Sequence, residues 1–420
     1  MAPSSPKHLW HCLSCCAFTV LFTFLQNTYA APSLKWSTGV GTDGNDHVFE
    51  GIHCSDRGFC IVGKCSEANE ASIDGFVIKL DPDGRQEWIS IFGIPDYHDE
   101  VRCIVEVSDG FLIGGTCSDT RQSRACLWKI DTSGNQLWRK TITHNGHGAI
   151  RSLRLTDEKS CVATGYIESK EFEVPFISDE SVGILIKTDL QGELQWQKEL
   201  SVAQGSRVMS HTHTDEIFIC GTAWRTTDGI EHQDAFLITC SADGKELSKE
   251  FYGDANMNQC FDGIAIDGGF MLSGHTTNDH NRNWDVWAVR LDGNGNLLWE
   301  AQFGPLIGHT KQDVFDECYC VKPTIDGGFV LACGSGIEPE NRKDKTAEEN
   351  VWAACLIKTD SEGNHEWTYV FHQPHKGHNA CEWVIPYGHQ NYLMLLDSDT
   401  LGTTDQSNVG LLNLQDVSPE

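Results

Sequence analysis

A segment that recurs along the whole chain constrains its fold more than any other feature of the sequence. Each copy has an apolar run, a turn of the form D-x-x-G and a second run that usually carries tryptophan. The first copy reads FVIKLDPDGRQEW, and successive copies lie 50–68 residues apart. Counting an isolated LKW near the start, the tryptophan slot holds Trp36, Trp88, Trp138, Trp196, Ser248, Trp299 and Trp367. A repeat of this length predicts that each copy is one unit that packs against the next.

Each unit predicts four short antiparallel strands. In the first unit we expect these strands at residues 48–54, 59–65, 76–81 and 87–92. In the D-x-x-G turn, Asp accepts a local backbone hydrogen bond and Gly tolerates a positive φ. Repeats of about 50 residues with four strands each predict an all-β fold, the β-propeller.

The two ends of the repeat array complement each other. The last unit, residues 382–414, supplies three strands and lacks the fourth, whereas a lone strand surrounds Trp36. Pairing the two would close the ring and remove both free edges. We therefore expect residues 31–420 to form one seven-bladed propeller of four-stranded antiparallel blades, closed by an N-terminal outer strand.

Residues 1–30 read as a secretory signal peptide. Lys7 gives a weakly positive start, residues 12–25 are an uncharged apolar run, and Thr28-Tyr29-Ala30 is a cleavage site of small-residue type. The run is too short for an ordinary transmembrane helix. We expect a secreted, extracellular protein with no membrane insertion after signal cleavage.

The repeat resembles that of secreted and lipoprotein β-propellers of bacteria, whose pattern is D-x-W-L-V-K-T-D-x-x-G-N-x-x-W-x-K-T-F-G-G. Segments such as VWAVRLDGNGNLLW and CLIKTDSEGNHEW carry this resemblance, which covers nearly all of residues 34–415. The chain resembles the tryptophan-docking repeats of quinoprotein propellers more distantly. That comparison implies eight blades and a quinone pocket. Because the chain has seven units and no vicinal cysteine pair after residue 30, we expect no quinone cofactor.

The repeat slots give structural roles to tryptophans and cysteines. The tryptophans of the repeat are expected to dock each blade against its neighbour. Three of the 18 cysteines precede residue 30, and about half of the others are expected to be core thiols. Cys126, Cys161 and Cys355 fill slots that are apolar in other units. The better disulfide or ligand candidates are Cys65, Cys117, Cys318 and Cys320, with no pairing that the sequence determines.

The charge of the chain narrows its choice of partners. Lys and Arg number 31 against 60 Asp and Glu, which gives a formal net charge of −29. A nucleic acid or an anionic membrane surface would need a basic surface instead. Much of this charge lies in unequal loops between the second and third strands of the units. We therefore expect an extracellular protein, a glycan or a small cationic ligand as partner.

Histidines recur in the loops that lead into the first strand of a unit. Five of these seven connections carry at least one, and propellers commonly bind ligands on such a face. Imidazole can act as a general base or ligate a metal, and a neighbouring carboxylate can raise its pKa. The candidate catalytic residues are His98, Asp99, His147, His309 and His378.

Further candidates for ligand binding lie on the same face or in the variable loops. Long, unequal loops on a rigid ring are suited to recognition. One example is the loop TTNDHNRNWD of the fifth unit. The candidate ligand-binding residues are His47, His280, Arg282 and Trp284.

Three hypotheses for function stay open. The first is a binding or scaffold propeller that recognises a protein or a glycan through its histidine-rich, acidic loop face. The second is an extracellular enzyme, either a polysaccharide lyase or hydrolase or a metal-dependent oxidoreductase, with a histidine-based site at the channel mouth. The third is a propeller stabilised by calcium at turns such as 292–300, although a plain hairpin turn explains those residues better, because strands flank them and the ligand set is incomplete. A divalent metal is thus the cofactor candidate.

Overall fold

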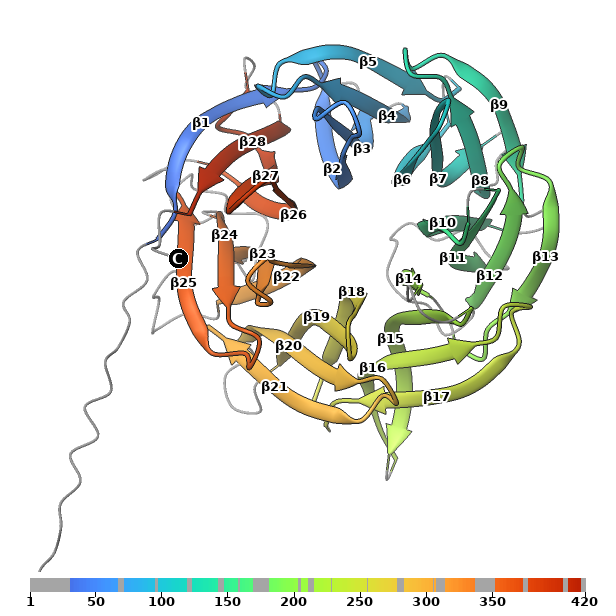
Figure 1. Cartoon of the computed structure of the whole chain (residues 1–420), viewed down its shortest axis with the longest axis vertical. Coiled ribbons are helices and arrows are strands. Elements are labelled where there is room, and N and C mark those ends of the chain that lie inside the picture. The colour runs from blue at the N-terminus through green and yellow to red at the C-terminus, as the bar shows by residue number, and fades with distance from the viewer. Residues whose placement is uncertain are drawn as a thin grey trace, which may run out of the picture.

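The computed structural model shows four-stranded sheets arranged around a ring (Figure 1). The structure describes residues 31–416 except 67–71, 95–96, 119–122, 143–146, 158, 169–180, 203–204, 211–214, 228, 255, 278–282, 305, 307–313, 337–351, 373–376 and 403–406. The expected signal peptide, residues 1–30, lies outside the described residues. In the described part of the chain, no helix is long and apolar enough to cross a membrane.

The strands take four positions between the channel and the outside of the ring (Figure 1). The innermost strands are β2 (Asn45–His53), β6 (Glu100–Val107), β10 (His147–Leu155), β14 (Arg207–Ser210), β18 (Asn258–Ile266), β22 (Phe315–Pro323) and β26 (Asn379–Tyr387). The second strands are β3 (Phe59–Ser66), β7 (Gly110–Ser118), β11 (Ser160–Glu168), β15 (Ile217–Thr227), β19 (Gly269–Thr277), β23 (Phe329–Gly336) and β27 (Asn391–Ser398).

The third and fourth strands complete the sheets. The third strands are β4 (Ile73–Leu80), β8 (Ser123–Ile130), β12 (Val182–Asp189), β16 (Ile230–Cys240), β20 (Trp284–Asp292), β24 (Trp352–Thr359) and β28 (Asn408–Gln415). The outer strands are β5 (Gln86–Phe92), β9 (Gln136–Thr141), β13 (Leu194–Glu199), β17 (Glu246–Tyr252), β21 (Leu297–Phe303), β25 (His365–Phe371) and β1 (Ser33–Val40).

Consecutive strands pair antiparallel within each sheet, except where the two chain ends meet. There β1 pairs with β28, so that this sheet has the order β1-β28-β27-β26. A single parallel pairing between β20 and β22, at Trp284 and Phe315, links two neighbouring sheets into one of eight strands. We refer to each four-stranded unit as a blade. The second and third strands are buried along most of their length because neighbouring blades cover both faces.

The D-x-x-G turns are closed hairpins. Asp81 accepts hydrogen bonds from the backbone N–H groups of Asp83 and Arg85, at 2.9 and 2.8 Å. Asp292 accepts the equivalent bonds from Asn294 and Asn296, both at 2.8 Å. These hydrogen bonds lower the pKa of both carboxyl groups, the backbone bond from Arg85 being the largest cause for Asp81. The aspartate in these turns thus holds the hairpin together, as the sequence pattern predicts.

The glycine of each such turn lies against an aromatic ring of the preceding blade. Gly134 has a φ of 82°, and a Cβ atom there would lie 2.7 Å from the Trp88 ring. Only a residue without a side chain fits this contact, and glycine also suits the positive φ. The pairs are Trp36 with Gly84, Trp88 with Gly134, Trp138 with Gly192, Trp196 with Gly244 and Trp299 with Gly363.

Two blades make this contact in another way. Where Ser248 replaces the tryptophan, Tyr252 at the end of the same strand donates its hydroxyl to the Gly295 carbonyl at 2.7 Å. The last blade has no such glycine turn, and the indole of Trp367, on β25 of the blade before it, donates to Asp416 at 2.9 Å. The inter-blade contact is therefore preserved even where the repeat pattern fails.

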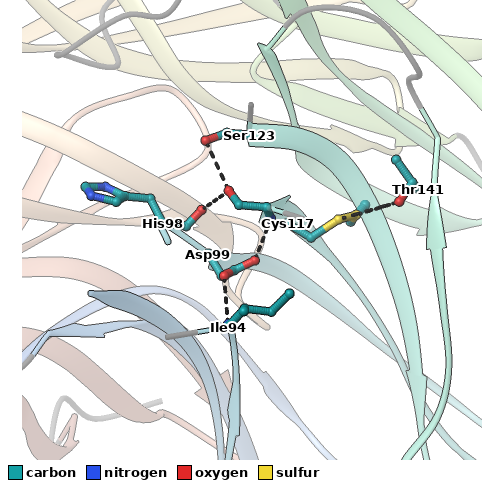
Figure 2. Close-up of a disulfide and its surroundings, with 8 residues drawn as sticks. Ile94, His98, Asp99, Cys117, Ser123 and Thr141 are labelled. Carbon is teal, nitrogen blue, oxygen red and sulfur yellow. Dashed lines mark hydrogen bonds between the residues drawn. A yellow bond between two sulfur atoms is a disulfide. The ribbon is translucent and has the colours of Figure 1, made fainter. Parts of the chain in front are cut away.

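A disulfide shows that our prediction for Cys126 is wrong. Cys117 and Cys126 form a disulfide between β7 and β8, with their Cα atoms 5.7 Å apart (Figure 2). We expected Cys126 to be a core thiol and grouped Cys117 with Cys65. The direct register partner of Cys117 is Arg124, and Cys126 lies two residues beyond it; such a diagonal neighbour does not emerge from aligning the repeats.

The remaining thiols are buried in the core. Thirteen cysteines in the described residues are free, and each of them is buried. They include Cys65, Cys318 and Cys320, which we expected to be disulfide or ligand candidates. Burial raises the pKa of Cys65 and of Cys320 to about 12, so both remain protonated. These thiols behave as small apolar side chains.

The Trp367 contact gives a first prediction. Trp367 is 3% exposed, so Trp367→Ala should lower the free energy of unfolding by about 3–5 kcal/mol. Trp367→Phe keeps most of the packing and loses the hydrogen bond to Asp416, so it should cost much less. Urea denaturation of both variants measures the difference. Equal losses in the two variants would show that packing at this position does not dominate.

Candidate functional site

The innermost strands direct an unusual set of side chains toward the channel. Six of them have a β-bulge, where one residue has no partner on the neighbouring strand. A bulge re-aims the extra side chain, and bulges are common next to active sites. The bulge residues are Phe49, Arg102, Arg151, Phe261, Tyr319 and Glu382.

All six bulge residues line one cavity at the centre of the ring. Its volume is about 420 Å³, which is within the usual range for small-molecule sites. Residues of every blade contribute to its wall. Besides the bulge residues, it is lined by His47, Lys64, Ser206, Arg207, Thr222, Gln233, Gln259, Cys260 and Trp383.

One wall of the cavity is cationic. Lys64 Nζ lies 3.2 Å from one oxygen of Glu100, and Arg102 lies 2.5 Å from the other. Burial would raise the pKa of Glu100, but Arg102 and Lys64 lower it to about 2. Phe49 supports the same two cations, with its ring centre 4.2 Å from the guanidinium of Arg102.

Arg151 adds a third cation to this wall. Its charge also acts on Glu100. Burial, followed by the like charge of Arg102, lowers the pKa of Arg151 to about 10. Positive charge is therefore concentrated where β3, β6 and β10 face the channel.

Arg207 crosses the channel beside this wall. It extends from β14 to Glu50 on β2, on the other side of the ring, at 2.6 Å (Figure 1). Its Nε also lies 2.6 Å from Asp262, and all three side chains are at least nine-tenths buried. Burial opposes the charge of Arg207, but Asp262 and Glu50 raise its pKa above the ordinary value. This arrangement joins three blades by buried ion pairs.

An indole packs against the same bridge. The guanidinium of Arg207 lies 4.7 Å from the ring centre of Trp383, and Lys322 Nζ lies 3.8 Å from it. The Trp383 indole donates to the Gly51 carbonyl at 2.8 Å. Cation–π contacts of this kind are strongest when they are desolvated. The bridge of Arg207, Glu50, Asp262 and Trp383 thus fills the channel next to the cavity.

The wall opposite the cations is acidic. The hydroxyl of Tyr319 donates to Glu317, and Glu382 lies beside both. Burial, then the charges of Asp397 and Glu317, raises the pKa of Glu382 well above its ordinary value. The strands β22 and β26 of this wall lie across the ring from β10 (Figure 1). The cavity therefore has cations on one side and carboxyl groups on the other.

His47 is one predicted site residue that lines the cavity. Its Nδ1 forms an ion pair with Asp397, and its ring packs edge-on against Phe49 at 4.6 Å. The same carboxylate accepts the backbone N–H of Val48 at 2.9 Å. The imidazole is thus fixed at the junction between the first and last blades.

His98 and Asp99 do not act on one another. The two oxygens of Asp99 accept the backbone N–H groups of Ser118, at 2.8 Å, and Ile94, at 3.2 Å. Figure 2 shows the exposed imidazole of His98 pointing away from this carboxylate. The backbone of His98 bridges to Ile73 of the preceding blade. Asp99 therefore holds the loop at the entrance to β6.

His147 and His378 lie at equivalent positions of other blades. The Nδ1 of His147 accepts the backbone N–H of Ser123 at 3.2 Å. His378 is exposed, and its backbone bridges to Trp352. No described contact joins His98, His147 or His378 to one another. His98 and His378 each lie at a backbone bridge between neighbouring blades.

Of the four remaining predicted residues, the structure describes only Trp284. His309, His280 and Arg282 lie outside the described residues. Trp284 is partly buried and stacks on His275, with ring centres 4.4 Å apart. Among the described residues, no group of three or more His, Cys, Asp or Glu side chains could hold a metal ion.

Apart from His47, the cavity residues were missed in the sequence analysis. One sequence signal could have indicated them. Inside the first strand of each unit, a polar or aromatic residue interrupts the alternation of apolar and polar residues. Arg102 in EVRCIVEV and Glu382 in NACEWVIPY are such residues. Bulges are not visible without strand pairing, so the sequence did not show that these side chains converge.

Known structures share this fold. No family model and no curated protein matches the chain. Hydrazine synthase of Kuenenia stuttgartiensis matches with 10% identity and a TM-score of 0.50, over 88% of this chain and 95% of its own. The structure of YCF48 bound to D1 peptide also matches with 10% identity and a TM-score of 0.50, over 91% and 97%. The β-propeller domain of the Trilobed protease from Pyrococcus furiosus matches with 12% identity and a TM-score of 0.46, over 90% and 97%. At such identities the likeness to hydrazine synthase and YCF48 shows a shared fold alone.

The channel bridge gives a second prediction. Arg207→Met would leave Glu50 and Asp262 buried without their main partner, and should lower the free energy of unfolding by about 3–5 kcal/mol. Arg139→Met, at an exposed position of β9, is the matched control and should change it by less than about 0.5 kcal/mol. Urea denaturation measures both. Similar values for the two variants would contradict the structural importance of the bridge.

Three buried aspartates give a third prediction, on pH. Burial is the largest cause that raises the pKa of Asp46, Asp99 and Asp316 to about 6. A raised pKa means that the folded state holds the proton more tightly than the unfolded chain, where Asp has a pKa of about 3.9. The resulting stability is present below about pH 4 and is lost as the pH rises through about 6.

The measurement is the free energy of unfolding as a function of pH. The wild type should lose stability between about pH 4 and pH 6, and Asp99→Asn should lose less over the same interval because one titrating group is gone. The comparison concerns the slope, so any constant cost of the amide cancels. An unchanged slope in the variant would rule out Asp99 as a contributor.

Proposed function

We propose that this chain is a seven-bladed propeller, closed by β1, that binds a small molecule in its central cavity. The observation that carries the proposal is the convergence of six bulge residues on one cavity of about 420 Å³. Bulges leave a residue unpaired and disrupt the ladder locally. Their repetition in six blades is explained if the side chains that they present have a common ligand.

Closure of the ring supports this proposal. The strand β1 pairs with β28 along its whole length, from Ser33 with Gln415 to Val40 with Val409. Trp36 then packs on Gly84 of the first blade, as the other tryptophans do in their blades. This pairing places the first and last blades side by side, and both contribute residues to the cavity.

Our proposal places the binding site in the cavity and not on the histidine-rich loop face. The histidine-rich face was expected to recognise a protein or a glycan, but the described histidines of that face are held separately at blade junctions. Several of the variable loops lie outside the described residues. The cavity, by contrast, has a defined volume, lining and charge.

We also propose that residues 1–30 direct export of the chain. The support is the apolar run and the small-residue cleavage site of the sequence. The disulfide between Cys117 and Cys126 agrees with an oxidising compartment. The thirteen other thiols are compatible with it because they are buried away from solvent.

Ligand-dependent thermal unfolding tests the binding function. A screen of small metabolites against the purified chain should contain compounds that raise the melting temperature by a few degrees at about 100 times their Kd. Ser206→Trp places a large ring at the cavity wall and should abolish these shifts. Leu298→Trp, on an exposed part of β21, is the control and should preserve them. Shifts that survive Ser206→Trp, or an absence of shifts in the wild type, would contradict the proposal.

A further inference from the structure

Two cations of the cavity wall share one carboxylate. Lys64 and Arg102 both pair with Glu100, and Arg151 lines the cavity beside them. The guanidinium of Arg102 also packs on the ring of Phe49, whose centre is 4.2 Å away. The wall is thus a fixed arrangement of donors with an excess of positive charge facing the cavity.

Another cation in the same channel has a structural role. Arg207 pairs with two carboxylates, Glu50 and Asp262, both at 2.6 Å, and these carboxylates also pair with Arg154 and Lys322. Arg207 thus contacts carboxylates from two blades, whereas Lys64 and Arg102 share the single carboxylate of Glu100.

The opposite wall does not favour a second anion. Glu382 and Tyr319 line the cavity there, with Glu317 and Asp397 near Glu382. An anionic group placed at that side would meet the carboxyl group of Glu382, whose own ionisation is already disfavoured by burial and by its acidic neighbours. A neutral or cationic end of a ligand would meet hydrogen-bonding groups instead.

The cationic wall of the cavity and the chain as a whole have charges of opposite sign. The chain carries −29 overall, which led us to expect a cationic ligand from composition alone. The cavity wall formed by Lys64, Arg102 and Arg151 has the other sign. Recognition in the channel therefore follows the local charge and not the average charge of the surface.

We propose that the cavity binds an organic molecule with one anionic group at one end, held by Lys64, Arg102 and Arg151, and a neutral or cationic end directed to Tyr319 and Glu382. This inference rests on the proposed binding function and names the class of its ligand. The guanidinium groups suit a carboxylate or a phosphate monoester, both of which accept two parallel hydrogen bonds.

Isothermal titration calorimetry with a matched set of probes tests the ligand class on the full chain. The probes are hexanoate, hexyl phosphate, adipate and hexylamine, which share an alkyl chain and differ in their end groups. We expect hexanoate or hexyl phosphate to bind, and the tighter of the two identifies the anionic group. Adipate, with an anion at each end, should bind at least about tenfold more weakly, and hexylamine should not bind detectably. Equal binding of adipate and hexanoate, or tighter binding of hexylamine, would overturn the inference.

Two substitutions test the residues. Arg102→Gln should weaken binding of the anionic probe by about tenfold or more, the usual effect of losing a charge-assisted hydrogen bond. Arg139→Gln, outside the channel, should not change it. Glu382→Gln should reduce the preference for hexanoate over adipate, and an unchanged preference would rule out the proposed orientation.

The two proposals fail in different ways. If none of the anionic probes binds, but compounds from the thermal screen bind in a manner abolished by Ser206→Trp, the ligand class is wrong and the binding function stands. If neither the probes nor any screened compound binds, the binding function itself is wrong.

Discussion

The structure depends on the contact between an aromatic ring of one blade and the turn glycine of the next. Trp88 on Gly134 is typical, because the ring occupies the space that any side chain at that glycine would need. The contact fixes each blade relative to its neighbour at the outside of the ring. The distances between innermost strands, and so the width of the channel, follow from this outer contact. Tyr252 and Asp416 show that the geometry is kept where tryptophan or glycine is absent.

Much of this architecture could be predicted because its causes are local in sequence. An aspartate that binds its own turn and a tryptophan seven residues later recur with the same spacing, so the strands and hairpins follow from one alignment of the units. The disulfide partner of Cys117 did not follow, since it depends on the diagonal neighbour of a strand pair. The cysteines of the core were predicted in kind, although more of them are free than we expected.

The candidate site was harder to predict because it is assembled from residues of every blade. His98 and His378 were predicted as catalytic candidates because histidine recurs at their position. In the structure each of them lies at a backbone bridge to the preceding blade. Arg102 and Tyr319 share no residue type, and only their bulged position relates them. Aligning the units detects residues that recur in each of them, such as the turn aspartate and the docking tryptophan. The cavity is lined by bulge residues, which share a position in the units but differ in residue type.

The pairing of β1 with β28 has a consequence for biosynthesis. The hydroxyl of Ser33 donates to the carbonyl of Gln415 across a separation of 382 residues, so β1 has no strand partner until β28 has been synthesised. His47 and Glu382, which line the same cavity, are likewise brought together only after β26 has been synthesised. Until β28 is in place, the edge of β1 is an open template for pairing with other chains. A ligand of the cavity would therefore distinguish the closed ring from nascent forms that lack β28.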